Sequence, residues 1–398
     1  MEVRILKKED QLDLYKLETI AFVGSMDVDE AKRRYAEESD GNWNYTWGCF
    51  NDAGKLSAAV INNPFHCWYE GQKVAMGGVG GVASLPEGRT KGAVRAIFRA
   101  IFADMRAKGE FLSTLYPFSH SYYRQYGYEV CNMPNRVVFP VAALKKFRQT
   151  MEARMHLTGE PIDDFKTVYD RFAQAYNLAT ARDDFSWKWT LGGDPYKDRK
   201  YRYLLYEDGQ PRAYVNFRPG DPKQPGAGHM AVVEQMAFDG AEALYNILGF
   251  LSKLSAQYGH VQMTLPGDID LPILLDEPYE CECTRAFSGM ARLVDVQRAL
   301  ELLRAPQGEG ECAIRVEDEF LPENSGCYRL RYAGGALSAE KGEFEADLCL
   351  SEQTLCQLCL GALSMDQARW KQDVILKGEN PALWALFPGK KVFLTNGF

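Results

Sequence analysis

The segment of the chain best suited to chemistry is residues 79–95, VGGVASLPEGRTKGAVR. A glycine-rich run is followed by a short loop that holds Arg89 and Lys91, and a helix is predicted to begin directly after Gly92. The first backbone N–H groups of a helix have no partner within it, and they form the positive end of its dipole. With two cations beside it, such an end predicts a phosphate site. A bulged strand followed by a solvated basic turn would use the same residues without a ligand.

Other motifs that would indicate a nucleotide or a metal are absent from the sequence. No GxxxxGK[ST] run occurs, and the glycines at 77–81 precede the loop instead of spanning a strand-to-helix turn. The five histidines are isolated and the ten cysteines are scattered. Cys356 and Cys359 have a metal-like spacing, but leucines flank them in a predicted apolar helix. We therefore expect reduced core cysteines and no bound metal.

Length and charge limit the classes of function. The 398 residues, 46% of them hydrophobic, are enough for about two to four globular domains. A net charge of −8 argues against nucleic-acid binding through bulk charge and would suit a cationic substrate. No run approaches a membrane span, and the charged start lacks the apolar region of a signal peptide. We expect a cytoplasmic protein with neither a nucleic-acid nor a membrane partner.

Alternating strands and helices are predicted to position the loop. The glycine-rich run belongs to a strand over about 73–84, and apolar residues spaced by three and four predict a helix that ends at Lys108-Gly109. Upstream, the pattern predicts a strand at 3–6, a helix from Asp10 to about Phe22, and a hairpin with arms at 46–50 and 56–61. Downstream, it predicts a buried strand at 111–116 and a short helix turning into a strand over 119–130.

The same order of strand, helix and strand recurs later in the chain. Asp52 and Asp208, in corresponding hairpin turns, are 156 positions apart. A duplication explains the recurrence, and two unrelated α/β stretches are the alternative. In the second copy the position of the phosphate loop reads FDGAEA, residues 238–243, with two acids and no cation. Because these acids would repel phosphate, we expect one active site per chain.

The order of predicted strands and helices changes after about Gly289. Strands come first, followed by an apolar helix and by a last helix before a final short strand, which predicts an α+β module. We therefore expect a mixed α/β chain with domains at 1–140, 141–288 and 289–398. The second domain is expected to wall the substrate cleft and to carry subunit contacts.

The loop and the order of elements resemble the acetyl-CoA-dependent N-acetyltransferase (GNAT) superfamily, whose pyrophosphate loop reads Q/R-x-x-G-x-G/A. Here the loop is RTKGAV, residues 89–94, without the last glycine. The enhanced intracellular survival (Eis) branch of aminoglycoside acetyltransferases shares that departure. Pro86, GMARLVD at 289–295 and the terminal Phe398 also resemble this branch, as does YRQYGY at 123–128, with its arginine one place earlier. The resemblance covers the whole chain and implies tandem GNAT acetyltransferase-like domains followed by a sterol-carrier-protein-like α+β domain.

The resemblance also implies the ligands and their contacts. Acetyl-CoA is the expected co-substrate, a small-molecule amine such as an aminoglycoside is the expected acceptor, and a homohexamer is the expected assembly. A splayed strand would present the backbone of Val82, Ala83 and Ser84 to the pantetheine amides. The pyrophosphate would be surrounded by Arg89, Thr90, Lys91, Gly92, Ala93, Val94 and Arg95, and the far side of the cofactor would be lined by Phe118 and Ser119.

Acetyl transfer from a thioester requires a proton for the leaving thiolate, which departs more easily when a positioned acid protonates it. Tyr123, four residues before Gly127, occupies the place of the superfamily's general acid. Tyr122, Tyr126 and Tyr128 are the alternative tyrosines nearby.

The transfer also requires a base, because an alkylammonium is mostly protonated near neutral pH. Glu87 would oppose the charge of the pyrophosphate, and Glu129 belongs to the closing strand, so neither is well suited. The resemblance implies that the α-carboxylate of Phe398 takes the proton. The apolar tail VFLTNGF is compatible with this role, since it is expected to be buried.

Two other functions remain open. The third domain resembles a lipid-binding module, so the chain could be an apolar-ligand carrier with a vestigial acetyltransferase domain. The side chains that would line a cavity there are also what a core needs. They are Leu355, Leu358, Leu360, Leu363, Trp370, Trp384 and Phe387. An acetyltransferase-shaped protein that uses another acyl-CoA is the third possibility, and the intact RTKG loop favours an enzyme over the carrier.

Overall fold

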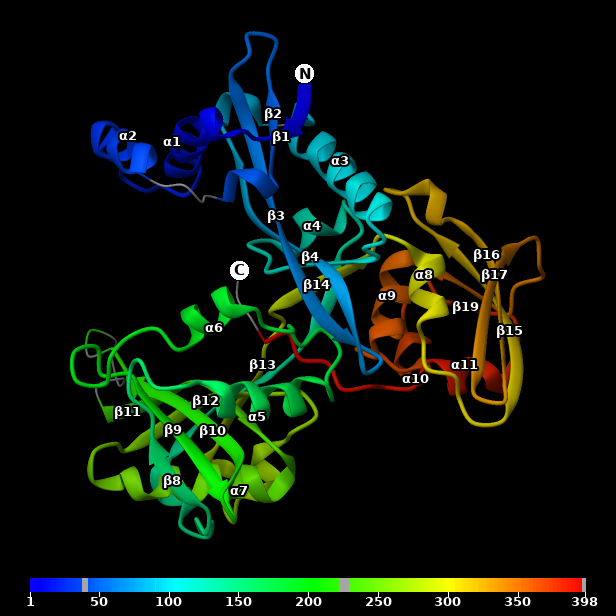
Figure 1. Cartoon of the computed structure of the whole chain (residues 1–398). Coiled ribbons are helices and arrows are strands. Elements are labelled where there is room, and N and C mark those ends of the chain that lie inside the picture. The colour runs from blue at the N-terminus through cyan, green and yellow to red at the C-terminus, as the bar shows by residue number, and fades with distance from the viewer. Residues whose placement is uncertain (38–41, 90, 222, 224–228, 396–398) are drawn as a thin grey trace. The chain divides into compact units, whose positions relative to one another are not determined.

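Two compact units make up the structure, a computed structural model that describes residues 1–37, 42–89, 91–221, 223 and 229–395 (Figure 1). The first unit comprises residues 1–131 and 289–389, and the second comprises 132–288 and the tail that begins at Lys390. Two sheets belong to the first unit and one belongs to the second. No helix in the described ranges is long and apolar enough to cross a membrane.

A seven-stranded sheet carries the predicted phosphate loop. Its order is β1-β2-β3-β4-β5-β14-β6. The strands are β1 (Glu2–Ile5), β2 (Thr46–Phe50), β3 (Leu56–Tyr69), β4 (Gln72–Ser84), β5 (Leu112–Leu115), β6 (Glu129–Asn132) and β14 (Gly289–Leu293). The predicted strands and the predicted hairpin of this region are confirmed, although the second hairpin arm is longer than expected and runs on to Tyr69.

Helices cover both faces of this sheet (Figure 1). On one face lies α1 (Gln11–Ala21), which is followed by α2 (Val28–Glu37), and on the other lies α3 (Ala93–Ala107). The apolar face of α3 is buried as its spacing predicted: Ile97, Phe98, Ile101, Phe102 and Met105. Each buried side chain of this size contributes roughly 1.5–3 kcal/mol. Packing therefore fixes α3 against the strands that lead into its N-terminus.

A second seven-stranded sheet has the order β13-β7-β12-β11-β10-β9-β8. Its strands are β7 (Asn135–Pro140), β8 (Glu152–Met155), β9 (Tyr201–Glu207), β10 (Gln210–Pro219), β11 (Met230–Phe238), β12 (His260–Leu265) and β13 (Glu282–Arg285), and its helices include α5 (Asp163–Ala173), α6 (Asp184–Thr190) and α7 (Gly240–Ser252). The order β11–α7–β12 repeats β4–α3–β5, and both strand pairs are parallel. This repetition is what a duplication predicts.

One strand falls on the other side of an expected boundary. The boundary predicted at residue 140 places β7 with the first domain, but β7 pairs with β12 and β13 in the second sheet. In the first sheet, β14 occupies the position between β5 and β6, although it follows the second unit in sequence. Local patterning does not reveal such an exchange, because it depends on pairing between segments more than 100 residues apart.

The remaining sheet has five strands in the order β17-β16-β15-β18-β19. Its elements are α8 (Val296–Glu301), β15 (Glu309–Glu317), β16 (Gly326–Ala333), β17 (Ala336–Gly342), β18 (Leu348–Ser351), α9 (Glu352–Leu360), α10 (Met365–Ala368), β19 (Ile375–Leu376) and α11 (Pro381–Leu386). Cys356 and Cys359 are buried free thiols on α9, which confirms that they are core residues. The predicted final strand is wrong for the described part of the tail, which ends at Thr395, since a single bridge between Val392 and Asn177 forms there.

Candidate active site

A bulge interrupts β4 just before the loop. Ala59 of β3 pairs with Ala83, but Ile61 pairs with Gly80, so β4 has one residue more than its partner over this interval. Gly81 has a φ of 54°, and a methyl group on it would lie 2.5 Å from Cδ1 of Ile61. Only glycine combines that backbone conformation with so close an approach. The glycine-rich run is therefore the bulged strand that the sequence indicated.

Beyond the bulge, β4 has a free edge. Its parallel register with β5 extends from Met76 to Val79, whereas β4 itself continues to Ser84. The part of the chain that the structure describes contains no further pair between these strands, so the edge of residues 80–84 that faces away from β3 is open. Val82, Ala83 and Ser84 are on this edge. An open strand edge can bind an extended polar chain through its N–H and C=O groups.

The free edge leads into the N-terminus of α3. Gly92 caps the helix with a φ of 78°, and there is open space around the position where its Cβ would be. Arg89, Lys91 and Arg95 are exposed around this end. The helix is 15 residues long, and its first amides and its dipole favour an anion. Thr90 lies outside the described residues.

Three of the predicted pyrophosphate residues have structural contacts of their own. Ala93 and Val94 are buried, so only their backbone groups are available to a ligand. The guanidinium of Arg95 lies 4.9 Å from the ring centre of Phe320.

The Glu87 carboxylate, 3.5 Å from Nζ of Lys55, has a lowered pKa because of a hydrogen bond with its own backbone and the nearby lysines. Glu87 is therefore held as an anion and is unsuited to act as a base.

A cluster of aromatic rings follows β5 on α4 (His120–Arg124) and the turn after it. Ser119 begins the helix, and its hydroxyl accepts a hydrogen bond from the Tyr122 amide at 3.4 Å. Tyr123 is buried, and its ring contacts those of Phe118 and Tyr122 at centroid distances of 5.4 and 5.2 Å. Phe118 is 73% exposed, so it is available to a ligand beside the cluster.

The hydroxyl groups of the four candidate tyrosines differ in their partners. Tyr126 donates to the hydroxyl of Tyr122 at 3.4 Å, and Tyr128 lies 2.7 Å from the Ser113 hydroxyl on β5. The hydroxyl of Tyr123 forms no hydrogen bond with any residue that the structure describes. Burial, with a smaller effect of Tyr122, raises the pKa of Tyr123, so this tyrosine retains its proton. Of the four, Tyr123 is the one whose hydroxyl has no hydrogen-bond partner among the described residues, whereas the hydroxyl of Tyr122 accepts a hydrogen bond from Tyr126.

The turn that follows Tyr123 packs against buried ionisable side chains that the sequence pattern did not reveal. Arg292 of β14 is fully buried, donates to the carbonyl oxygen of Tyr126 and forms an ion pair with Asp318 at 2.5 Å. Glu352 accepts a hydrogen bond from the Leu293 amide at 2.6 Å, and burial raises its pKa to about 8. Their partners are distant in sequence, so no local signal marks these residues as a group.

A carboxylate near the bulge was also missed. Glu18 of α1 is half-buried, and its Oε1 atom lies 3.5 Å from the position that a Cβ on Gly81 would occupy. Burial raises the pKa of this carboxyl. The available signal was its place in the apolar stripe of α1, four residues after Leu14 and one after Leu17.

The predicted base, the α-carboxylate of Phe398, lies outside the described residues. The tail before it packs within the second unit. Leu394 is buried, and its amide donates to Oδ1 of Asn132 at 3.0 Å. The Thr395 hydroxyl lies 2.5 Å from that of Tyr169. Of the described apolar residues of the tail, Leu394 is buried, and Val392 and Phe393 are half-buried.

At the corresponding helix of the second unit, acids lie at the helix end, and the nearby arginines, Arg212 and Arg171, are paired with one of them. Asp239 precedes α7 and forms an ion pair with Arg212 at 2.9 Å, while Glu242 lies in the first helical turn. Acids therefore occupy the end of the helix dipole where phosphate would bind, as the sequence indicated.

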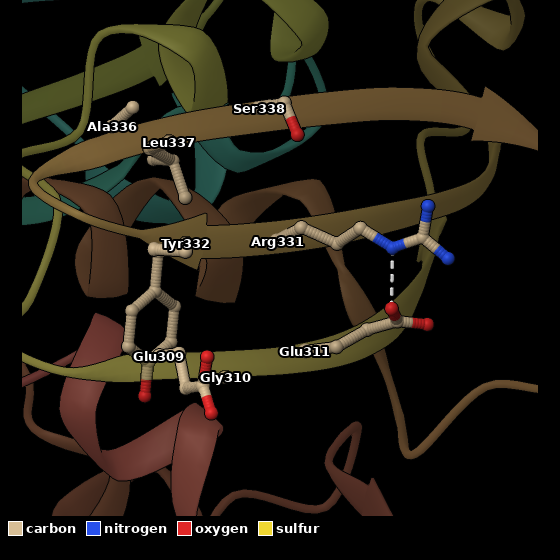
Figure 2. A pocket seen from close by; sticks show the side chains of 9 residues that line it. Glu309, Gly310, Glu311, Arg331, Tyr332, Ala336, Leu337 and Ser338 are labelled. Carbon is tan, nitrogen blue, oxygen red and sulfur yellow. Dashed lines mark hydrogen bonds and ion pairs between the residues drawn. The ribbon is translucent and has the colours of Figure 1, made fainter.

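An open groove of about 700 Å³ lies on the third sheet (Figure 2). Its walls come from β15, β16 and β17, with an ion pair between Arg331 and Glu311 across two of the strands. The Tyr332 ring lies over Gly310. None of the predicted site residues lines the groove. Among the described residues, no group of His, Cys, Asp or Glu side chains is arranged to hold a metal.

Models of three protein domains match the chain. An acetyltransferase (GNAT) domain matches residues 2–131, another acetyltransferase (GNAT) domain matches 178–293, and a sterol carrier protein domain matches 296–395. A relative from Streptomyces avermitilis, named an uncharacterized N-acetyltransferase, is 26% identical over 390 residues, which cover 92% of this chain and 90% of the relative.

Solved structures share the fold over the full length of the chain. A GCN5-related N-acetyltransferase from Anabaena variabilis has a TM-score of 0.85 at 21% identity, with 100% of both chains covered. Eis1 from Mycobacterium abscessus has a TM-score of 0.80 at 18% identity, also with 100% of both chains covered.

These matches agree with the geometry of the first sheet. The predicted fold class, tandem GNAT domains followed by a sterol-carrier-protein-like α+β domain, is confirmed. GNAT domains imply acetyl-CoA as the co-substrate and a small molecule as the acceptor. The chain therefore belongs to the GNAT family of N-acetyltransferases and is an acyltransferase enzyme.

Proposed function

We propose that the chain transfers an acetyl group from acetyl-CoA to a primary amine of a polycationic molecule such as an aminoglycoside, at one active site per chain in the first GNAT domain. The observation that carries this proposal is the free edge of β4 that leads into a glycine-capped, cationic helix end. The corresponding helix of the second unit begins with acids. Phosphate would be attracted to the first helix end, whereas the second offers it acids and arginines that are already paired with an acid.

Acetyl-CoA would bind along β4 with its pyrophosphate at the N-terminus of α3. The backbone of residues 82–84 would pair with the pantetheine amides, and residues 89–95, Thr90 included, would surround the pyrophosphate. Phe118 and Ser119 would line the far side of the cofactor. The open strand edge and the exposed cations support this arrangement.

In the transfer step the amine nitrogen attacks the thioester carbonyl carbon, so that a C–N bond forms and the C–S bond breaks. Tyr123 would donate its hydroxyl proton to the departing thiolate. This role is supported by its raised pKa and by a hydroxyl that has no hydrogen-bond partner among the described residues. The α-carboxylate of Phe398 would take the proton of the ammonium. The packing of the tail as far as Leu394 supports an anchored C-terminus.

The resemblance to the Eis branch supports a polycationic acceptor and a homohexamer. A net charge of −8 is compatible with a cationic substrate. Light scattering of the purified protein would test the assembly, for which we expect the mass of six chains. A monomer would contradict the hexamer while leaving the chemistry intact.

Mass spectrometry tests the proposed activity directly. The wild-type enzyme would be incubated with acetyl-CoA and, separately, with a kanamycin-type aminoglycoside, a lysine peptide and a simple monoamine. We expect acetylated product from the aminoglycoside, and far less product from a Tyr123→Phe control. Failure to acetylate any amine would contradict the proposal. A preference for a longer acyl-CoA would show that the donor is wrong.

A carrier function is not favoured. The leucines suggested as a cavity lining, Leu355, Leu358 and Leu360, are fully buried in the core of the third domain, and Trp370 is 86% exposed. The GNAT matches and the intact basic loop indicate an enzyme instead.

A further inference from the structure

Glu18 is a carboxylate at an unusual place. It follows Leu14 and Leu17, which are buried against the sheet, so its side chain lies at the margin of the same apolar cluster. Its Oε1 atom lies 3.5 Å from the Cβ position of Gly81, at the bulge of β4. The side of an amphipathic helix that faces a sheet is normally apolar, so an acid there is unusual. A packing role would be better filled by an apolar residue.

The carboxylate also lacks a counterion. In the described part of the chain, its oxygens have neither a hydrogen-bond donor nor a cation within ion-pair distance. Two other acids near this sheet are paired, Asp10 with Arg4 at 2.7 Å and Glu129 with Arg124 at 2.8 Å. Burial of an unpaired carboxylate disfavours its charged form and costs stability. Such a group is retained more readily when a ligand supplies the missing cation.

The place of Glu18 coincides with the expected end of the bound cofactor. The pyrophosphate site is at the N-terminus of α3, and the open edge of β4 runs from Ser84 back toward Gly80. A pantetheine arm that follows this edge away from the phosphates brings its thioester toward the bulge at Gly81. The acceptor nitrogen must approach to about 3–3.5 Å from the thioester carbon before it reacts. A carboxylate beside Gly81 is therefore within reach of the acceptor.

We propose that Glu18 binds the ammonium group of the acceptor beside the bulge of β4 and makes the enzyme selective for strongly basic amines. This inference rests on the proposed acetyltransferase function and adds a residue that recognises the acceptor. The proton acceptor remains the α-carboxylate of Phe398. Glu18 holds the cation in place before that proton leaves.

Steady-state kinetics with two matched acceptors tests this role. One acceptor is an alkylamine that is cationic at the assay pH, and the other is a fluorinated analogue of similar shape whose lower basicity leaves it neutral. Glu18→Gln keeps the size of the side chain and removes its charge. We expect KM for the cationic amine to rise about 10- to 100-fold, with kcat and the Kd for acetyl-CoA little changed, because a charge-assisted hydrogen bond is lost. KM for the neutral analogue should change less than about threefold.

Asp13→Asn is the matched control, since Asp13 lies on the same helix but is exposed and paired with Lys16 at 3.0 Å. It should leave both KM values unchanged. Glu18→Gln should also melt at or above the wild-type temperature, because it removes an unpaired half-buried charge. A purely structural Glu18 would instead give a lower melting temperature and an equal loss with both acceptors.

Calorimetric titration of the cationic amine into the enzyme separates this inference from the proposed function. Turnover by the wild type with equal KM values in Glu18→Gln overturns the role of Glu18 and leaves the function standing. Binding that depends on Glu18 without any acetyl transfer supports the ammonium site and contradicts the function. A wild type that neither binds nor acetylates amines overturns both.

Discussion

The junction between β4 and α3 and the junction between β11 and α7 have the same topology and opposite electrostatics. In each, a strand that pairs in parallel over a short register leads into a long helix. The first helix begins at Gly92 with cations around it, and the second begins after Asp239, which Arg212 already neutralises. We propose that a few charges at the helix end decide whether phosphate binds, so that a shared backbone path alone would not conserve the ligand site.

The segments after the two junctions differ as well. The chain after β5 forms α4, which carries Tyr123 with its hydroxyl unengaged by the described residues. The chain after β12 forms a short 3-10 helix, Leu271–Leu274, whose first residue is buried. We propose that the first segment supplies a proton to the leaving group through Tyr123. The 3-10 helix of the second segment consists of leucine, proline and isoleucine, which have no proton to donate.

The largest effect on activity is expected when the proposed proton donor of the first GNAT domain is removed. Tyr123→Phe should lower kcat by about 10²- to 10⁴-fold, since it removes the acid and hardly alters packing. The Kd for acetyl-CoA should stay within about twofold of wild type by calorimetry. Tyr126→Phe and Tyr128→Phe serve as matched variants, because their hydroxyls have protein partners. A greater loss of kcat in either of them would assign the acid to that tyrosine instead.

The next largest effect is expected at the C-terminus. The residues before it pack in the second unit, and we propose that its carboxylate accepts a proton in the active site of the first GNAT domain. Three glycines added after Phe398 would displace the carboxylate by up to about 10 Å. Acetyl transfer should slow by at least about 10²-fold, with the melting temperature and acetyl-CoA affinity retained. Unchanged turnover in this extended protein would leave the tail with a packing role only.

Changing one charge at each junction tests the comparison itself. Arg89→Glu should weaken acetyl-CoA binding by about 100-fold, because a negative charge would face the pyrophosphate. Asp239→Asn, which removes an acidic charge at the second junction, should leave acetyl-CoA affinity unaltered. Fluorescence or calorimetric titration measures both. Equal affinities in wild type and Arg89→Glu would show that the phosphates bind elsewhere.

The smallest effect concerns the buried charges behind the turn that follows Tyr123. The pKa of Glu352, about 8 in the folded state, lies above its unfolded value, so the folded protein holds the proton more tightly. The stability this provides is complete below the unfolded pKa and is lost as the pH rises through about 8, by up to about 1.4 kcal/mol per pH unit. Glu352→Gln stays neutral, so its melting temperature should fall less than that of wild type between about pH 6 and about pH 8. Parallel pH profiles for the two proteins would show that Glu352 does not titrate in this range.

Local patterning predicted most of the fold. The spacing of Ile97, Phe98 and Ile101 predicted the buried face of α3, and the glycine-rich run indicated the bulged strand. The place of β14 between β5 and β6 could not be predicted in this way, since strand pairing across the chain depends on contacts that no local period encodes. The tail was expected to contain a final short strand, but its described residues form one bridge and are held by side chains such as Asn132.

The site was predictable where a motif marks it. The loop at residues 89–94 and Tyr123 lie in sequence patterns that resemble a known family, and the structure adds the open edge of β4 to them. Glu18, Arg292 and Glu352 were missed because their importance depends on burial and on partners distant in sequence. A charged residue within an apolar stripe is the one local sign that could have identified Glu18.

The number of acetyl-CoA molecules bound per chain tests the central claim most directly. Isothermal titration calorimetry of the wild-type protein should give one site per chain, because, of the two junctions in the described part of the chain, the one at Gly92 combines an open strand edge with a cationic helix end. Two sites per chain would contradict the account, since they would show that the acidic junction at Asp239 also binds the cofactor.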